Sequence, residues 1–240
     1  MEIFDSLEKC LQTKAVDQTN LVQLRGQKRV MTICAVKNGF VEQFSHVSLS
    51  GVGIRVFVDN KSWGFSSANR IDSDSIELTL KNALKLAKAS SKLKRQKIIL
   101  EPTKKSSADI STLVKKPLQD FSVEEIAKIP SEAYEGTKEA GSKVADAKAT
   151  FISIEDDKYF LSSEGSRIHQ NLTRVLLFVN VLAKSNSLLC PASENLGHAG
   201  GLELFDKTSP YSLGKKVAEE AVRLLNAKVP PSGKFRVVIH

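Results

Sequence analysis

The fold is decided by the stretch QKRVMTICAV-KNG-FVEQFSHVSL, residues 27–49. Two segments that alternate between apolar and polar residues flank the pair Asn38-Gly39. Asn-Gly accepts positive φ angles, so this pair between alternating segments predicts a tight antiparallel hairpin. The chain is therefore expected to start its sheet here, with strands at residues 27–36 and 40–49.

The neighbouring segments extend this hairpin into a meander of four antiparallel strands. A third strand is predicted at 51–58, a turn at Asp59-Asn60 and a fourth strand at 63–66. Helices are predicted at 3–12 and from a capping pair at Asp74 and Glu77 to Leu93. The second helix is expected to cover one face of the sheet.

A second unit of sheet and helix is predicted after a linker. Ser122-Val123-Glu124-Glu125 has a capping-box pattern, and Pro130 is expected to break the helix that follows. Residues 148–155 and 158–163 are predicted to form a hairpin around Asp156-Asp157. Further expected elements are a turn at Ser162–Gly165, a strand at 168–184 and a helix from Ser209-Pro210 to Ala227.

The fold class that follows is α+β, with an antiparallel meander covered by helices and then a second sheet-and-helix unit. The predicted domains are 1–95 and 121–240, and residues 96–120 form the linker because they are rich in Lys, Ser, Thr and Pro. Near the end of the chain, 235–239 reads as an apolar strand with nothing after it to pair. We expect the sequence to continue in a parent protein and this edge to associate with other chains.

The composition is that of a globular protein, with 41% hydrophobic and 26% charged residues in 240. The longest apolar run, residues 175–183, is about half of a membrane span, and the acidic N-terminus has no secretory signal pattern. No membrane association and a cytoplasmic location are therefore expected. The three cysteines, Cys10, Cys34 and Cys190, are far apart and are interpreted as reduced.

The net charge of +8 comes from one region, because residues 81–105 hold nine basic residues and one acidic residue. Lys81, Lys85, Lys88 and Lys92 fall at helical spacing opposite Leu80, Leu84 and Ala87. This pattern favours a solvated helix face. The alternative is a surface for an acidic partner or nucleic acid, but no specific nucleic-acid binding is expected, since the region lacks aromatic residues for base stacking.

No catalytic or metal-binding residues are predicted within these 240 residues. His46, His169, His198 and His240 form no i, i+4 pair and have no carboxylate at metal-ligand spacing. The segment from Gly51 to Val56 lacks the third glycine of a dinucleotide fingerprint, so its glycines are assigned to a bulge or a close backbone approach. One glycine-rich loop is either a plain loop or a peptide-facing loop, and its candidate residues are Gly197, His198, Gly200 and Gly201.

Several segments in order give the chain a resemblance to the TldD/PmbA family of metallopeptidases, once described as modulators of DNA gyrase. The resemblance covers nearly the whole chain and corresponds to the N-terminal and middle regions of the family. The TldD type is favoured over the PmbA type by the Pro-Ser-Gly run. The segments that carry the resemblance are 51–56, 63–69, the helix at 83–89, 163–165, the loop at 200–201, 218–225 and 231–239.

The resemblance implies a parent enzyme that works on small or unfolded peptides as a homo- or heterodimer of related subunits. It also implies a His-Glu-x-x-x-His zinc motif beyond His240, in a C-terminal catalytic domain absent from these residues. The chain itself is then expected to be inactive and to hold no zinc, and to supply the wall of a substrate chamber and subunit contacts. The alternative is a self-contained binding module that uses the basic face of 81–105.

Overall fold

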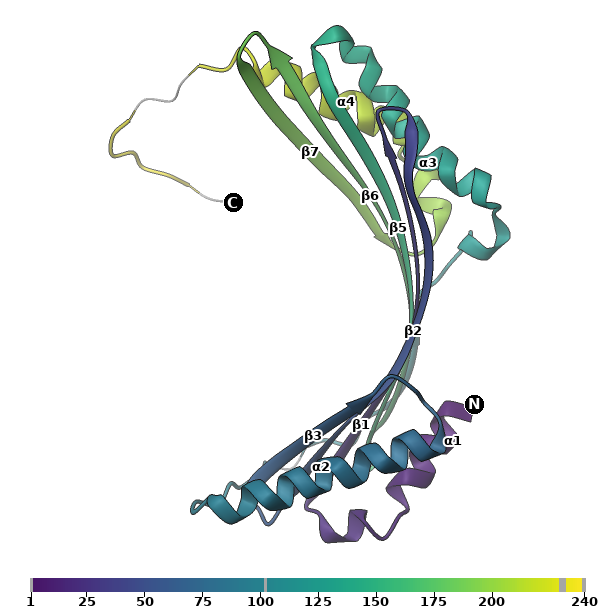
Figure 1. Ribbon diagram of the computed structural model, residues 1–240, viewed down its shortest axis with the longest axis vertical. Helices are drawn as coiled ribbons and strands as arrows, with labels where there is room; N and C mark the ends of the chain where they lie inside the picture. The colour runs from purple at the N-terminus through teal and green to yellow at the C-terminus, as the bar shows by residue number, and fades with distance from the viewer. Residues whose placement is uncertain (1, 102, 229–231, 239–240) are drawn as a thin grey trace.

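The computed structural model describes residues 2–101, 103–228 and 232–238, and its centre is one curved sheet of seven strands (Figure 1). The strand order is β3-β2-β1-β5-β6-β4, and β7 pairs with another part of β6. Among the described strands, only the β4–β6 pair is parallel. The strands are β1 (Leu21–Lys37), β2 (Phe40–Val58), β3 (Ser62–Ala68), β4 (Ser107–Ser111), β5 (Val144–Ser162), β6 (Arg167–Ser185) and β7 (Leu188–Ala199).

Four α-helices cover the convex face of the sheet, two at each end, and the concave face carries none of them (Figure 1). The α+β class is thereby confirmed. One end has α1 (Glu2–Leu11) and α2 (Ser73–Leu93), and the other has α3 (Val123–Thr137) and α4 (Pro210–Leu224). The short 3-10 helices are η1 (Val16–Gln18), η2 (Leu118–Asp120), η3 (Lys138–Lys143) and η4 (Leu202–Asp206).

Two hydrophobic cores lie under these helix pairs and share the same long strands. Val22 and Leu24 of β1 are buried under α1 and α2, whereas Cys34 of the same strand joins the core under α3 and α4. Side chains alternate between the faces of a strand, so these even-numbered residues all point to the convex face. The odd-numbered residues of β1 are therefore left to the concave face.

The first segments of the predicted meander are confirmed, but the meander has three strands instead of four. The turn residues Asn38 and Gly39 have φ angles of 48° and 88°, and Asp59 and Asn60 have 55° and 54°. The break predicted near residue 50 is wrong, because β2 continues to Val58. A Cβ atom at Gly51 would lie 2.9 Å from the carbonyl oxygen of Ala68, so this glycine permits the close approach of β3.

The hairpin predicted around Asp156-Asp157 is also wrong. β5 continues through both residues and pairs with β1 and β6 along its length. The turn between β5 and β6 comes later, at the predicted Ser162–Gly165 segment, where Gly165 has a φ angle of 94°. Two adjacent aspartates are typical of a turn, but Asp156 is 1% exposed because cations from other strands neutralise it.

The predicted capping box of α3 is confirmed, since Ser122 accepts the N–H of Glu125 and the Glu125 carboxylate accepts the N–H of Ser122. The helix does not break at Pro130, which is buried among core residues of α3. The cost of one lost backbone hydrogen bond is offset by this packing. The predicted start of α4 is confirmed as well, with Ser209 as its N-cap.

Strands from the predicted domains 1–95 and 121–240 pair directly in this sheet. β1 and β5 are antiparallel neighbours from the pair Gln23 and Ser162 to the pair Lys37 and Lys148. The segment between them contributes β4 to the edge of the sheet. The domain boundary itself stays a prediction.

The last described residues, 232–238, form no helix or strand, and Phe235, Val237 and Val238 are exposed. The predicted strand is not formed in that part, and Ile239 and His240 lie outside the described residues. The three cysteines are free, as expected. None of the described helices has the length and apolar character needed to cross a membrane.

Candidate functional site on the concave face

The concave face of the sheet is apolar toward the α3–α4 end. Ile33 of β1 lies opposite Ile152 of β5, which in turn lies opposite Leu176 of β6. These side chains are only partly buried, because no described helix covers this face. The same row pattern continues with Met31 and Ile154, so a band of aliphatic side chains crosses the sheet.

The middle of the concave face carries a buried carboxylate surrounded by cations. The Asp156 side chain is 0% exposed and accepts hydrogen bonds from Arg29 at 2.7 and 2.9 Å and from Gln27 at 2.7 Å. Arg174 also donates to it, and the Lys158 amine lies 3.6 Å away. Three cations therefore share one carboxylate.

The charge state of Asp156 follows from this arrangement. Burial raises its pKa, but the hydrogen bonds from Arg29 and Gln27 and the charges of Arg29 and Lys158 lower it by more. The net effect is a pKa below the ordinary value for an aspartate. Asp156 is thus a carboxylate under ordinary conditions, and its neighbours still carry an excess of positive charge.

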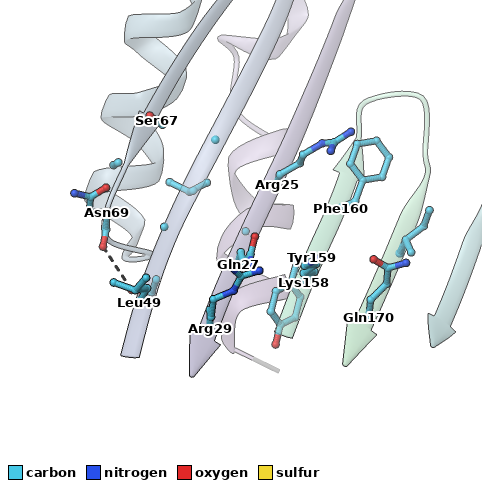
Figure 2. A pocket seen from close by; sticks show the side chains of 17 residues that line it. Arg25, Gln27, Arg29, Leu49, Ser67, Asn69, Lys158, Tyr159, Phe160 and Gln170 are labelled. Atoms are coloured by element: carbon cyan, nitrogen blue, oxygen red, sulfur yellow. Dashed lines mark hydrogen bonds between the residues drawn. The ribbon is translucent and has the colours of Figure 1, made fainter. Parts of the chain in front are cut away.

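A cavity of about 790 Å³ lies next to this cluster, toward the α1–α2 end (Figure 2). It is formed by β1, β2, β3, β5 and β6, and its lining includes three cations and no carboxylate. Nothing in the sequence marks this site, because its residues come together only through strand register. The residues that bear on its chemistry are Arg25, Gln27, Arg29, Asn69, Lys158 and Gln170.

A second polar cluster lies on the convex face and is structural. His169 of β6 lies 3.0 Å from Asp109 of β4 through Nδ1 and 2.6 Å from Asp157 of β5 through Nε2. The Tyr159 hydroxyl donates to Asp157. Burial, and to a smaller extent this hydrogen bond, raises the pKa of Tyr159. The cluster ties the edge strand β4 to the sheet.

The predicted peptide-facing loop is divided between β7 and a tight turn. Gly197 and His198 belong to β7, and Gly200 and Gly201 follow it. A Cβ atom at Gly201 would lie 2.2 Å from the carbonyl oxygen of Lys116, so the turn packs against that segment. The contact of these residues with peptide stays a prediction.

Glu203 fixes this turn through its carboxylate. It accepts the backbone N–H groups of Gly201 and Lys116, each at 3.0 Å. Burial raises its pKa, but hydrogen bonds from the backbone of Gly201, Glu203, Lys116 and Lys115 outweigh burial and lower it to about 2.

The predicted basic surface lies on the other side of the sheet from the cavity, on the solvent side of α2. Its four lysines, Lys81, Lys85, Lys88 and Lys92, are exposed, and the opposite side of the helix buries Leu80, Ala83 and Ala87. Lys81 forms an ion pair with Glu77 one turn earlier. The lysines thus occupy a solvated helix face, and their role in binding is untested.

The described residues do not fit the zinc that the family resemblance implies for the parent enzyme. Within the described ranges, no three His, Cys, Asp or Glu side chains are grouped so as to hold a metal ion. His46 contacts Thr32, and both ring nitrogens of His169 already face carboxylates. His240 lies outside the described residues.

Comparison with known proteins matches the chain to two family models in order. Residues 22–87 match PmbA/TldA metallopeptidase domain 1, and residues 116–225 match the PmbA/TldA metallopeptidase central domain. Together the two models match most of the chain.

Two curated relatives are similar over nearly the whole chain. A metalloprotease of Methanocaldococcus jannaschii is 29% identical over 89% of this chain and 46% of its own length. A metalloprotease of Methanothermobacter thermautotrophicus is 31% identical over 92% of this chain and 47% of its own. The chain therefore spans about half the length of these relatives.

Solved structures share the fold at low sequence identity. A candidate modulator of DNA gyrase from Bacteroides thetaiotaomicron has a TM-score of 0.79 at 15% identity, over 97% of this chain and 52% of that one. One from Thermotoga maritima has 0.76 at 18%, over 96% and 50%. TldE from Thermococcus kodakarensis has 0.64 at 11%, over 91% and 46%.

Proposed function

This chain belongs to the PmbA/TldD family of metallopeptidases, and we propose that it forms the peptide-holding wall of such an enzyme without a metal centre of its own. The observation that carries the proposal is the bare concave face, with its aliphatic band and adjoining cavity. Uncovered apolar surface that adjoins a cavity is typical of a binding site. In the parent enzyme this face would line the chamber that receives small or unfolded peptides.

An open strand edge supplies a physical means of holding an extended peptide. β3 pairs with β2 only from Val52 to Val58, so among the described strands nothing pairs with the outer edge of β2 at residues 40–51. Main-chain groups along such an edge can bind a peptide as an added strand and read little of its sequence. Val47 and Leu49, 36% and 54% exposed, give this edge apolar contacts on the concave face.

The same edge is suited to subunit contacts, and we propose that the parent protein is a homo- or heterodimer of related subunits in the cytoplasm. Zinc and the catalytic residues would lie in the part of the parent protein that corresponds to the unmatched half of the relatives. The 240-residue chain would then bind peptide but not hydrolyse it.

Peptide binding by the purified chain tests the proposal. A labelled, C-terminally amidated peptide without stable structure or acidic side chains is titrated by fluorescence anisotropy against wild type and the double variant Val47→Lys/Leu49→Lys. Lysines on an edge oppose strand pairing, so we expect affinity to fall at least about fivefold. Leu86→Lys on α2 is the matched control, since Leu86 is 53% exposed on the convex side and its variant should bind normally.

Hydrolysis and metal content are measured on the same preparation. We expect no cleavage of the peptide and no stoichiometric zinc after dialysis. Stoichiometric zinc together with cleavage that a chelator abolishes would overturn the non-catalytic role. Equal peptide affinity for wild type and the double edge variant would instead overturn the use of the β2 edge.

A further inference from the structure

We propose that the cavity on the concave face binds the carboxylate of a peptide, with Arg25 as the cation that receives it. This inference rests on the proposed function, in which the concave face holds peptides. It names the group of the peptide that is bound, a carboxylate, and the residue that fixes the position of the bound peptide.

The cavity carries a net positive charge. Arg25, Arg29 and Lys158 line it, and no aspartate or glutamate does. Asp156 lies beside the cavity and engages Arg29 and Lys158, but it neutralises only one of the cations near it. A cavity with uncompensated cations attracts an anionic group.

Arg25 is the cation in the lining with no carboxylate contact in the described part of the chain. Its guanidinium carbon lies 5.3 Å from the centre of the Phe160 ring on the neighbouring strand, and Figure 2 shows the side chain extended toward that ring. A cation–π contact with an aromatic ring helps to hold the guanidinium in place without using its N–H groups. Such a fork matches the two oxygens of a carboxylate.

Arg29 provides a second, fixed cation at the other side of the cavity. Two of its donors are used by Asp156, at 2.7 and 2.9 Å, so the guanidinium is held in one orientation. Gln27 and Gln170 add amide groups to the lining. Several side chains can therefore contact a polar group in the cavity, so its binding does not depend on one residue.

The shape of the cavity favours a peptide end over a small inorganic anion. Gly51 and Gly53 contribute no side chains to its lining, and a volume of about 790 Å³ is in the range of sites for drug-sized organic ligands, well above what a small anion needs. Leu49, Phe160 and Ile168 add apolar surface beside the cations. An apolar terminal residue could contact that surface while its carboxylate meets Arg25.

The test compares three labelled peptides of about ten residues that differ in one carboxylate. The first has a free C-terminal carboxylate and no acidic side chain, the second is its C-terminal amide, and the third is the amide with one internal glutamate. We expect the free acid to bind about fivefold tighter than the amide at low salt. The glutamate peptide tells whether a side-chain carboxylate serves as well.

Two arginine variants locate the effect. Arg25→Gln should reduce the acid-to-amide ratio to about one, whereas Arg55→Gln should keep it. Arg55→Gln removes the same charge from the neighbouring strand β2. The Arg55 guanidinium lies over Trp63, outside the cavity. Circular dichroism of both variants checks that the fold is retained.

The possible failures are distinguishable. If acid and amide bind wild type equally, the carboxylate site is wrong and peptide binding stands. If neither peptide binds, the proposed function fails together with this inference. Inorganic phosphate, a short DNA strand and acetate are also compared as competitors at equal concentration. If phosphate or DNA displaces the acid peptide to the same extent as acetate, the site binds anions in general, and the peptide carboxylate is overturned as its ligand.

Discussion

Asp156 and Arg29 face each other across the β1–β5 pair, and Arg29 donates from Nε to Oδ1 at 2.7 Å and from Nη2 to Oδ2 at 2.9 Å. The contact fixes strand register between residues 127 positions apart in sequence. A slip of one residue would move Asp156 to the convex face, away from all of its cations. The Arg29–Asp156 ion pair therefore stabilises the strand pairing in the middle of the sheet, which neither helix pair covers.

The variant Asp156→Asn should lower the free energy of unfolding by about 2 kcal/mol, because it leaves the surrounding cations without their shared carboxylate. Urea unfolding at pH 7 measures the change. Glu42→Gln is the control, since it removes the same charge from an exposed ion pair with Lys148. A similar small change in both variants would contradict the role given to Asp156.

The sequence predicted those parts of the fold that depend on neighbouring residues. The turn at Asn38-Gly39 requires positive φ angles, and the capping box from Ser122 to Glu125 is a contact within four residues. Local chemistry is enough for both. In contrast, the continuity of β5 through Asp156 depends on Arg29 and Arg174, which lie on other strands, so the aspartate pair taken alone predicts a turn.

Glu203 should make stability depend on pH in the acid range. Its pKa is about 2 in the folded protein against 4.5 as the ordinary value, so the unfolded chain binds a proton first as the pH falls through this window. Stability from this group is present above pH 4.5 and is lost toward about pH 2. Glu203→Gln should therefore be less stable than wild type at pH 7, and the difference should shrink on acidification.

Urea unfolding at several pH values between 7 and 2.5 checks this dependence. Glu194→Gln serves as control, because Glu194 is a partly exposed residue of β7 that pairs with Lys216 on the surface. A difference between wild type and Glu203→Gln that stays constant with pH would show that Glu203 acts by packing alone.

The crossing of α3 and α4 should tolerate no side chain at Gly214. A Cβ atom there would lie 1.8 Å from the carbonyl oxygen of Ala133, which is backbone and cannot turn away. Gly214→Ala should cost roughly 3 kcal/mol of stability, despite the better helix propensity of alanine. Gly197→Ala on β7 is the matched control, since its nearest contact would be 3.6 Å from Leu176 and its stability should change little.

The lysines of α2 should give weak DNA binding that depends strongly on salt. If Lys81, Lys85, Lys88 and Lys92 contact four phosphates, affinity should fall about 100-fold between 50 and 200 mM salt, without preference for a sequence. Anisotropy with two unrelated duplexes measures this, and replacing the four lysines by glutamine should abolish it. Salt-resistant binding to one duplex would favour the binding module over the peptidase part.

The candidate site was less predictable than the fold. Arg25 and Phe160 are separated by more than half of the chain, and the register of β1 on β5 brings them together. The loop at Gly200-Gly201 shows the limit of composition, because its glycine-rich sequence is compatible with a plain loop and with a peptide-facing loop, and the structure shows Gly201 packed against Lys116. Composition marks where the backbone is permissive, but it does not say what approaches it.

Deletion of residues 234–240 should reduce self-association of the chain and leave its fold intact. Phe235, Val237 and Val238 are 61%, 72% and 76% exposed, and burying such side chains contributes about 2 kcal/mol each. The ordering cost of association offsets much of that gain, so pairing is expected only at high concentration. Sedimentation of both forms measures the effect, and circular dichroism checks the fold. The open β2 edge is the competing surface for association. If the deletion leaves self-association unchanged and Val47→Lys/Leu49→Lys abolishes it, self-association is assigned to the β2 edge. The tail then has no role in it.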